Sequence, residues 1–137
     1  EDAENMLKNY WNYIQLNPMK IVYTEYWFSF DAQYATLQGQ CDRIDLDDEN
    51  NIFIIDYKTS KRPATERELK KNLQLGIYAI FSMCEGVELE NKRIQGLPKK
   101  LSMLFPLTEN VAIKTLFVLS QNIFIKEKLI LMQVFQI

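Results

Sequence analysis

The chain has 137 residues, enough for one domain with a buried core, and its 47% hydrophobic and 25% charged residues exclude a disordered or collagen-like protein. Sixteen Lys and Arg against eighteen Asp and Glu give a formal charge of −2, which is not the strongly basic balance of a protein held to nucleic acid by charge alone. The two cysteines, Cys41 and Cys84, are too few for a disulfide framework or an iron–sulfur cluster, and they indicate a reducing, cytoplasmic setting.

The start of the chain and its apolar stretch near the C-terminus indicate how the protein is organised. It begins with Glu1 rather than Met, so we expect residues 1–137 to form a single domain that is a fragment of a longer protein. No signal peptide is recognisable. The apolar stretch 111–125 is interrupted by polar residues and does not predict a membrane span.

The first part of the chain predicts one helix and three strands. Apolar residues recur at helical spacing over residues 2–16. Aromatic and β-branched residues predict strands at 21–30 and 34–46. A polar turn at 47–51 leads into a third strand, 52–58, whose apolar residues fall on both faces. Such a strand usually lies in the centre of a sheet, covered on both sides.

The second part predicts a helix, a strand and a further helix. The helix should run from near Thr65 to about Cys84. Its expected buried residues are Leu69, Leu73, Ile77, Ile80 and Phe81. A fourth strand is predicted at 101–107 and a closing helix at 111–128, while the apolar tail 129–137 has no assignment. This order of elements predicts a mixed α/β domain.

Asp56, Tyr57 and Lys58 form the strongest local signal for chemistry. Residues two apart on a strand point to the same face, so the Asp56 carboxylate and the Lys58 ammonium should emerge side by side. Charges at the end of a hydrophobic strand are costly to bury unless they are paired or bound to a metal ion. The tripeptide alone is equally compatible with a plain Asp–Lys ion pair.

Asp42, on the preceding strand, brings a second carboxylate to the same place. A hairpin that turns near Glu49 and Asn50 sets Asp42 opposite Tyr57, within reach of Asp56. Two carboxylates on adjacent strands repel one another unless a cation lies between them. Mg²⁺ takes oxygen ligands, needs only one or two carboxylates and keeps several waters.

Three further residues are candidates for the same site. Glu25 is an acid inside an aromatic-rich strand, where packing does not explain it. It could equally face solvent at a strand edge. Gln74 and Tyr78 are four residues apart and share one face of the helix that follows the Asp56 strand.

A cationic stretch follows these residues. Between Lys58 and Lys71 six cations stand against two anions, a local charge of +4. The four cations expected to contact nucleic acid are Lys61, Arg62, Lys70 and Lys71. A solvated helix face is the alternative interpretation of this run.

Taken together, these residues resemble a known family. The shared pattern consists of Glu25, then Gly39-x-x-Asp42-Arg43-Ile44-Asp45, then Ile55-Asp56-Tyr57-Lys58-Thr59-Ser60, then Gln74-Leu-x-x-Tyr78-Ala79. It is similar to the RecB-like nucleases of the PD-(D/E)XK, restriction-endonuclease-like superfamily, which include helicase-linked nuclease domains and CRISPR-associated exonucleases. The match covers a little under half of the chain.

The resemblance implies a fold and an activity. The fold would be α/β, a restriction-endonuclease-like core in which a three-strand meander plus a further strand form a central mixed sheet flanked by helices. The activity would be that of a metal-dependent DNA nuclease, in particular an exonuclease of repair, recombination or defence. Its partners would be DNA and a helicase or further domains of the same protein.

The resemblance also implies residue roles. Asp42 and Asp56 would bind Mg²⁺ or Mn²⁺ together with the carbonyl of Tyr57. Lys58 would position the attacking water or stabilise charge on the phosphate. Gln74 and Tyr78 would contact the DNA strand or steady the site.

Two departures from the family pattern leave alternatives open. Many relatives carry a metal-binding histidine on an upstream helix, and this chain has no histidine. Either that helix precedes Glu1 or Glu25 takes over its role. The cysteine cluster of some relatives is also absent, so no iron–sulfur centre is expected. The alternatives are a catalytically inactive DNA-binding or scaffolding module and an RNA-directed nuclease.

Overall fold

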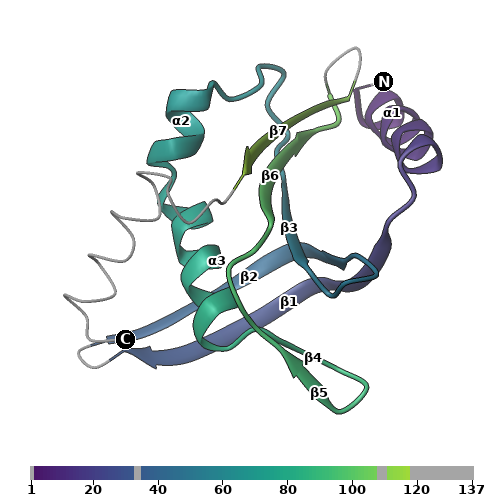
Figure 1. The fold of residues 1–137 in the computed structure, drawn as a ribbon. Coiled ribbons are helices and arrows are strands. Elements are labelled where there is room, and N and C mark those ends of the chain that lie inside the picture. The colour runs from purple at the N-terminus through teal and green to yellow at the C-terminus, as the bar shows by residue number, and fades with distance from the viewer. Residues whose placement is uncertain (1, 33–34, 108–110, 118–137) are drawn as a thin grey trace.

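Five strands form one mixed sheet in the computed structural model, which describes residues 2–32, 35–107 and 111–117 (Figure 1). Their order in the sheet is β1-β2-β3-β6-β7. Their bounds are β1 Lys20–Ala32, β2 Ala35–Leu46, β3 Ile52–Tyr57, β6 Lys100–Phe105 and β7 Ala112–Phe117. Neighbouring strands are antiparallel except for β3 and β6, which are parallel. The predicted α/β architecture, with a three-strand meander and a further strand, is confirmed.

The hairpin between β2 and β3 sets the register of the sheet centre. Asp47 closes the turn, because its Oδ1 accepts hydrogen bonds from the backbone N–H groups of Glu49 and Asn51 at 3.0 and 2.8 Å. Ile44 lies opposite Ile54 on the strands that follow. This register differs by one residue from the predicted one, and continuing it would set Asp42 opposite Asp56 rather than Tyr57.

The first helix, α1 (Asp2–Leu16), has the predicted bounds, but the second predicted helix is broken in two. Asn72 separates α2 (Glu66–Lys71) from α3 (Leu73–Cys84), with an extended backbone at φ −71° and ψ 114°. Its N–H still donates to the Leu69 carbonyl of α2, and its side chain accepts from the Leu75 N–H of α3. Asn72 therefore ends one helix and caps the next.

The break changes which leucines are buried. Leu69 and Leu75 are buried, at 3% and 0% exposure. Leu73, which was predicted to be buried, is 63% exposed because the break at Asn72 turns the helix face. Ile80 and Phe81 are buried as predicted, and Ile77 is partly buried against the core.

Helix α3 packs on the β1–β2 ribbon through aromatic side chains. The rings of Phe28 and Phe81 stack with centroids 4.4 Å apart. A side chain at Gly39 would place its Cβ 2.9 Å from the Phe28 ring and would force that ring to shift, so glycine suits this close packing. The core lies between α3 and the sheet.

Two elements differ from the sequence prediction. Residues 112–117 form strand β7 rather than the start of a helix, because they pair with β6, and the Ser102 and Thr115 hydroxyls are hydrogen-bonded at 2.9 Å. The rest of that predicted helix and the tail 129–137 lie outside the described residues. A small hairpin was not predicted: β4 (Val87–Leu89) and β5 (Lys92–Ile94), joined by Glu90 and Asn91 at positive φ.

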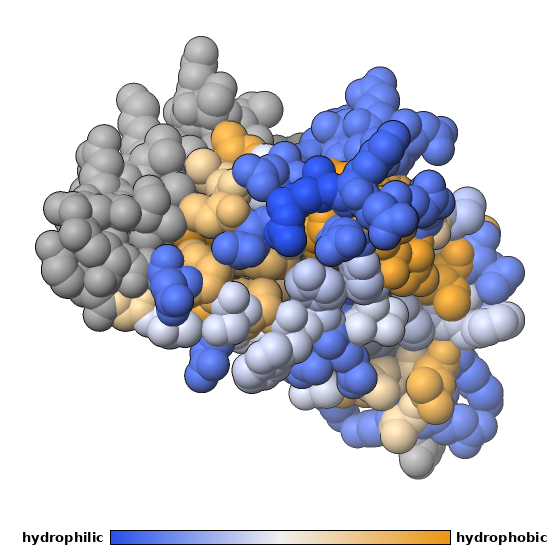
Figure 2. All heavy atoms as spheres, turned by 90° about the horizontal axis from the view of Figure 1, so that it is seen from below, coloured by the Kyte–Doolittle hydropathy of each residue, from blue (hydrophilic) through white to orange (hydrophobic). Residues whose placement is uncertain are grey.

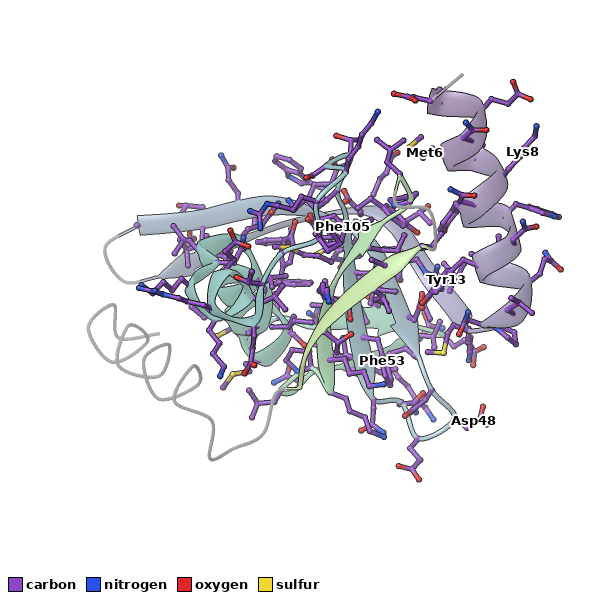
Figure 3. All side chains as sticks on the ribbon, turned by 90° about the horizontal axis from the view of Figure 1, so that it is seen from above. Met6, Lys8, Tyr13, Asp48, Phe53 and Phe105 are labelled. Carbon is purple, nitrogen blue, oxygen red and sulfur yellow. The ribbon has the colours of Figure 1, made fainter. Side chains whose placement is uncertain are left out.

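Helix α1 lies at the periphery and has no buried residue. Figure 3 shows Met6 and Tyr13 on the side of α1 toward the sheet and Lys8 on the opposite side. Leu7 and Trp11 are 63% and 62% exposed.

Figure 2 shows exposed hydrophobic regions between hydrophilic ones on the face seen from below. No helix in the described part of the chain is long and apolar enough to cross a membrane.

We expect the break at Asn72 to show in the stability of two leucine variants. Leu75→Ala should lower the free energy of unfolding by about 2–5 kcal/mol, because it leaves a cavity in the core. Leu73→Ala, the matched control two residues away, should change it by less than about 0.5 kcal/mol. Urea unfolding followed by circular dichroism measures both. Equal losses would mean that the helix continues through residue 72.

Candidate functional site

The candidate site begins where β2 and β3 separate. The last backbone pair between them is Arg43 with Ile55. One step beyond, the Tyr57 N–H donates to Asp42 Oδ2 at 2.7 Å, so a carboxylate replaces the next partner in the ladder. The parallel neighbour β6 stays paired with β3, and the Lys58 N–H donates to the Leu104 carbonyl at 2.9 Å. Asp42 therefore lies at the fork between the two strands.

Asp56 and Lys58 lie together as predicted. The Lys58 Nζ is 2.6 Å from Asp56 Oδ2, and Asp56 is 3% exposed. Within the described residues this Oδ2 makes no hydrogen bond of normal geometry, so the ammonium contacts it as an ion pair. Burial raises the pKa of Asp56 and the nearby Asp42 raises it further, while Lys58 opposes both effects.

Gln74 and Tyr78 of α3 complete a ring of polar contacts. Gln74 Oε1 accepts from Lys58 Nζ at 3.0 Å, so its Nε2 must donate to the Tyr78 hydroxyl, 2.8 Å away. The Tyr78 hydroxyl then donates to the Gln40 carbonyl of β2 at 2.9 Å and lies 3.4 Å from Asp56 Oδ1. Burial and the Asp56 charge raise the pKa of Tyr78, which keeps it protonated as a donor. Its hydroxyl thus spans the fork between β2 and β3.

Glu25 does not join this cluster. It is exposed, with a positive φ of 52°, and its carbonyl accepts from the Gln40 side chain at 3.2 Å. The positive φ takes Glu25 out of the strand alternation that would set its side chain beside Asp42. No group of three or more Cys, Asp or Glu side chains that could hold a metal ion occurs in residues 2–32, 35–107 and 111–117. The expected convergence of three carboxylates is therefore not found, and only Asp42 and Asp56 meet.

The cationic stretch is largely neutralised by neighbouring acids. Lys61 is 2.8 Å from Asp2 of α1. Further ion pairs along the stretch join Arg62 to Glu68 at 2.7 Å and Lys70 to Glu66 at 2.5 Å, besides that of Lys58 with Asp56. Of the four cations expected to bind nucleic acid, only Lys71 has no ion pair with a described residue. Arg67, which was not among the four, also has none with a described residue. The count of +4 already includes Glu66 and Glu68, so it is the contacts with two acids outside the stretch, Asp2 and Asp56, that make the local positive charge smaller than the sequence indicates.

A second buried ion pair lies on the other face of β2. Arg43 donates two hydrogen bonds to Asp45, each of 2.7 Å, and both residues are almost fully buried. Arg43 also reaches the Tyr10 hydroxyl of α1 at 3.3 Å, and the Tyr10 and Tyr57 hydroxyls are 2.6 Å apart. Arg43 and Asp45 belong to the family pattern, but the sequence analysis did not predict that they pair. The signal for the pair was the same two-residue spacing on a strand that brought Asp56 and Lys58 together.

The model of the PD-(D/E)XK nuclease superfamily matches residues 2–115, which include every residue of the site just described. The comparison with curated proteins gave no match.

Asp56 should make the protein less stable at neutral pH than an uncharged side chain would. A carboxyl whose pKa is raised by folding is favoured in the folded state only below its unfolded pKa of about 3.9, and that advantage is lost as the pH rises through the higher folded pKa. Asp56→Asn should therefore be more stable than the parent at pH 7 in EDTA, with the difference shrinking toward pH 3. Thermal unfolding across this pH range is the measurement. Parallel profiles for the two proteins would contradict the assignment.

Proposed function

We propose that this chain, which belongs to the PD-(D/E)XK nuclease superfamily, is a metal-dependent nuclease that hydrolyses phosphodiester bonds in DNA. One observation carries the proposal: Asp42, Asp56 and Lys58 meet at the end of β3, and Gln74 holds the lysine there. A pair of carboxylates beside a fixed ammonium suits chemistry on a phosphate diester, in which negative charge must be bound and then stabilised.

Asp42 and Asp56 are the residues that would hold a metal ion, together with the carbonyl of Tyr57. The donor set fits Mg²⁺ or Mn²⁺, because all three groups offer oxygen. The buried Asp56 Oδ2 has no hydrogen bond among the described residues, and the charge of Asp42 raises the pKa of Asp56. A cation between the two carboxylates would offset their repulsion and add a second partner to this oxygen, which is in an ion pair with the Lys58 ammonium. When bound, such an ion polarises the phosphate and lowers the pKa of a coordinated water.

Lys58 would supply positive charge to the phosphate as negative charge builds up on it. The Gln74 carbonyl oxygen, 3.0 Å from Nζ, fixes the direction of the ammonium. Tyr78 in turn fixes Gln74, because its hydroxyl accepts from the amide nitrogen at 2.8 Å. The protein thus prepares the position of the charge before substrate binds, which is how preorganised electrostatics lower a barrier.

The order of the sequence motifs supports a more specific type of nuclease. The sequence resemblance to RecB-like nucleases supports an exonuclease of DNA repair, recombination or defence that acts with a helicase or with further domains. Lys61, Arg62, Lys70 and Lys71 would contact the DNA backbone without reading bases. Of these, Lys71 is the best placed, since the other three are already in ion pairs.

A catalytically inactive DNA-binding module is the second candidate. Two contacts favour it: Asp42 Oδ2 is engaged by the Tyr57 N–H, and Asp56 Oδ2 by the Lys58 ammonium. In addition, Glu25 is exposed and stands apart from the two aspartates. Cleavage assays on single- and double-stranded DNA with Mg²⁺ and with Mn²⁺ separate the candidates. DNA binding without cleavage in any of these assays would leave the inactive module.

Metal binding should depend on both aspartates. Calorimetry with Mn²⁺ should give a binding isotherm for the parent protein and none for Asp42→Ala or Asp56→Ala, because a single carboxylate with one carbonyl holds the ion poorly. Asp48→Ala is the matched control, since Asp48 lies in the exposed β2–β3 turn, away from the site (Figure 3). An aspartate variant of the site that binds Mn²⁺ like the parent would show that the ligands are misassigned.

Lys58 should matter for turnover more than for DNA affinity. Lys58→Ala should lower kcat by about 10²-fold or more, the loss expected when a preorganised charge is removed from a transition state. Gln74→Ala should lower it less, because the ammonium remains but is no longer oriented. Lys92→Ala removes the same charge from an exposed position on β5, which has no part in the candidate site, and serves as the control. Near-normal turnover in Lys58→Ala would leave Lys58 a structural ion pair.

A further inference from the structure

Tyr57 belongs to the candidate site through its backbone and not through its side chain. Its N–H donates to the Asp42 carboxylate at 2.7 Å, and its carbonyl is the third oxygen of the proposed metal site. Because Tyr57 stands between Asp56 and Lys58 at the end of β3, its side chain points to the face of the sheet opposite theirs. A contact that holds this side chain therefore also fixes the peptide groups that the site uses.

The Tyr57 side chain is held by Tyr10 of α1. The two rings meet edge to face, with centroids 5.4 Å apart and planes at 85°, and their hydroxyls are hydrogen-bonded at 2.6 Å. Arg43 of β2 donates to the Tyr10 hydroxyl at 3.3 Å. Two hydrogen bonds of 2.7 Å to the buried Asp45 fix this guanidinium in turn. The Tyr10 hydroxyl thus joins Tyr57 to an immobile group of the neighbouring strand.

The end of β3 is supported from both of its faces. On the face of the site, Gln74 of α3 accepts from Lys58, and the Tyr78 hydroxyl lies 3.4 Å from Asp56. On the opposite face, Tyr10 of α1 supports the residue between these two. Such support matters for a bound ion, because Mg²⁺ requires near-octahedral geometry and its ligand distances vary by only about 0.2 Å. A small displacement of the strand end would therefore weaken metal binding.

We propose that Tyr10 is a positioning residue of the metal site: it holds the Tyr57 side chain and thereby fixes the Tyr57 peptide groups toward Asp42 and the ion. Helix α1 does not touch the metal in this arrangement. The coupling is reciprocal, so a bound ion strengthens the docking of α1 by the same factor by which docked α1 strengthens metal binding. This inference rests on the proposed function, because it requires a metal ion at Asp42 and Asp56.

The first test measures Mn²⁺ affinity by calorimetry. Tyr10→Phe should weaken Mn²⁺ binding by about tenfold, the lower end of the loss seen when a group that supports a metal ligand is removed. Tyr13→Phe is the matched control and should bind Mn²⁺ like the parent. It makes the same change on the same helix, on the side toward the sheet (Figure 3), at a hydroxyl that has no hydrogen bond with a described residue.

The second test uses the reciprocal effect on α1 and needs no Tyr10 variant. Lys8 is exposed on α1, and trypsin can cut the peptide bond after it only when the helix opens, so the cleavage rate follows the opened population. Saturating Mn²⁺ should slow this cut by about tenfold in the parent, by reciprocity with the first test. It should not slow it in Asp42→Ala, which lacks the metal site. A residue that only anchors α1 would give the same rate with and without the ion.

The outcomes separate this proposal from the proposed function. Parent-like Mn²⁺ affinity in Tyr10→Phe, an equal loss in Tyr13→Phe, or a cut after Lys8 that Mn²⁺ leaves unchanged in the parent would each overturn the role of Tyr10. The metal site itself would stand in all three cases, because the parent still binds the ion. A parent protein that binds no Mn²⁺ would overturn both the positioning role and the metal-dependent nuclease.

Discussion

The hydrogen bond from the Tyr57 N–H to the Asp42 carboxylate determines how the centre of the molecule is arranged. Backbone groups in a sheet interior need partners, and here a side chain provides one at the point where β2 leaves β3. The carboxylate of Asp42 is thereby fixed next to Asp56, and β2 is free to diverge. The gap between the strands is then occupied by the Tyr78 hydroxyl, which binds the Gln40 carbonyl on one side and approaches Asp56 on the other.

The polar ring around Lys58 depends on the break between α2 and α3. Because Asn72 starts a new helix, Gln74 falls in the first turn of α3, beside the end of β3. Each polar group around Lys58 has a defined role as donor or acceptor. The Lys58 ammonium can only donate, so the Gln74 oxygen must accept from it, and the Gln74 nitrogen must then donate to Tyr78. Asp56 differs from the other members, because it is a buried carboxylate whose Oδ2 meets the lysine as an ion pair and whose pKa is raised by burial. A site that keeps a charged group buried gives up stability, as functional sites commonly do.

Much of this site could be predicted from local patterns, and the remainder depended on tertiary contacts. Asp56 and Lys58 follow from strand alternation, and Gln74 with Tyr78 from helical spacing, so both pairs lie together as expected. Glu25 was expected to meet the aspartates, but its positive φ is a local backbone state that no sequence periodicity reveals. Likewise, the strand at 112–117 exists because β6 offers an edge for pairing, and its apolar residues fit a helix equally well in isolation.

The attachment of α1 has a consequence for motion. This helix buries no residue of its own, and polar contacts attach it: the Tyr10 hydroxyl meets Tyr57 and Arg43. Asp2 pairs with Lys61, and the Asn9 side chain donates to the Pro106 carbonyl. Detaching it exposes a guanidinium and two phenols, groups that water solvates well, and little apolar area. Its amide hydrogens should therefore exchange with solvent through a sub-global opening of low free energy, while those of β3 exchange only when the whole sheet unfolds. The strand that carries Asp56 thus contacts, through Tyr57, a helix that should open before the sheet does.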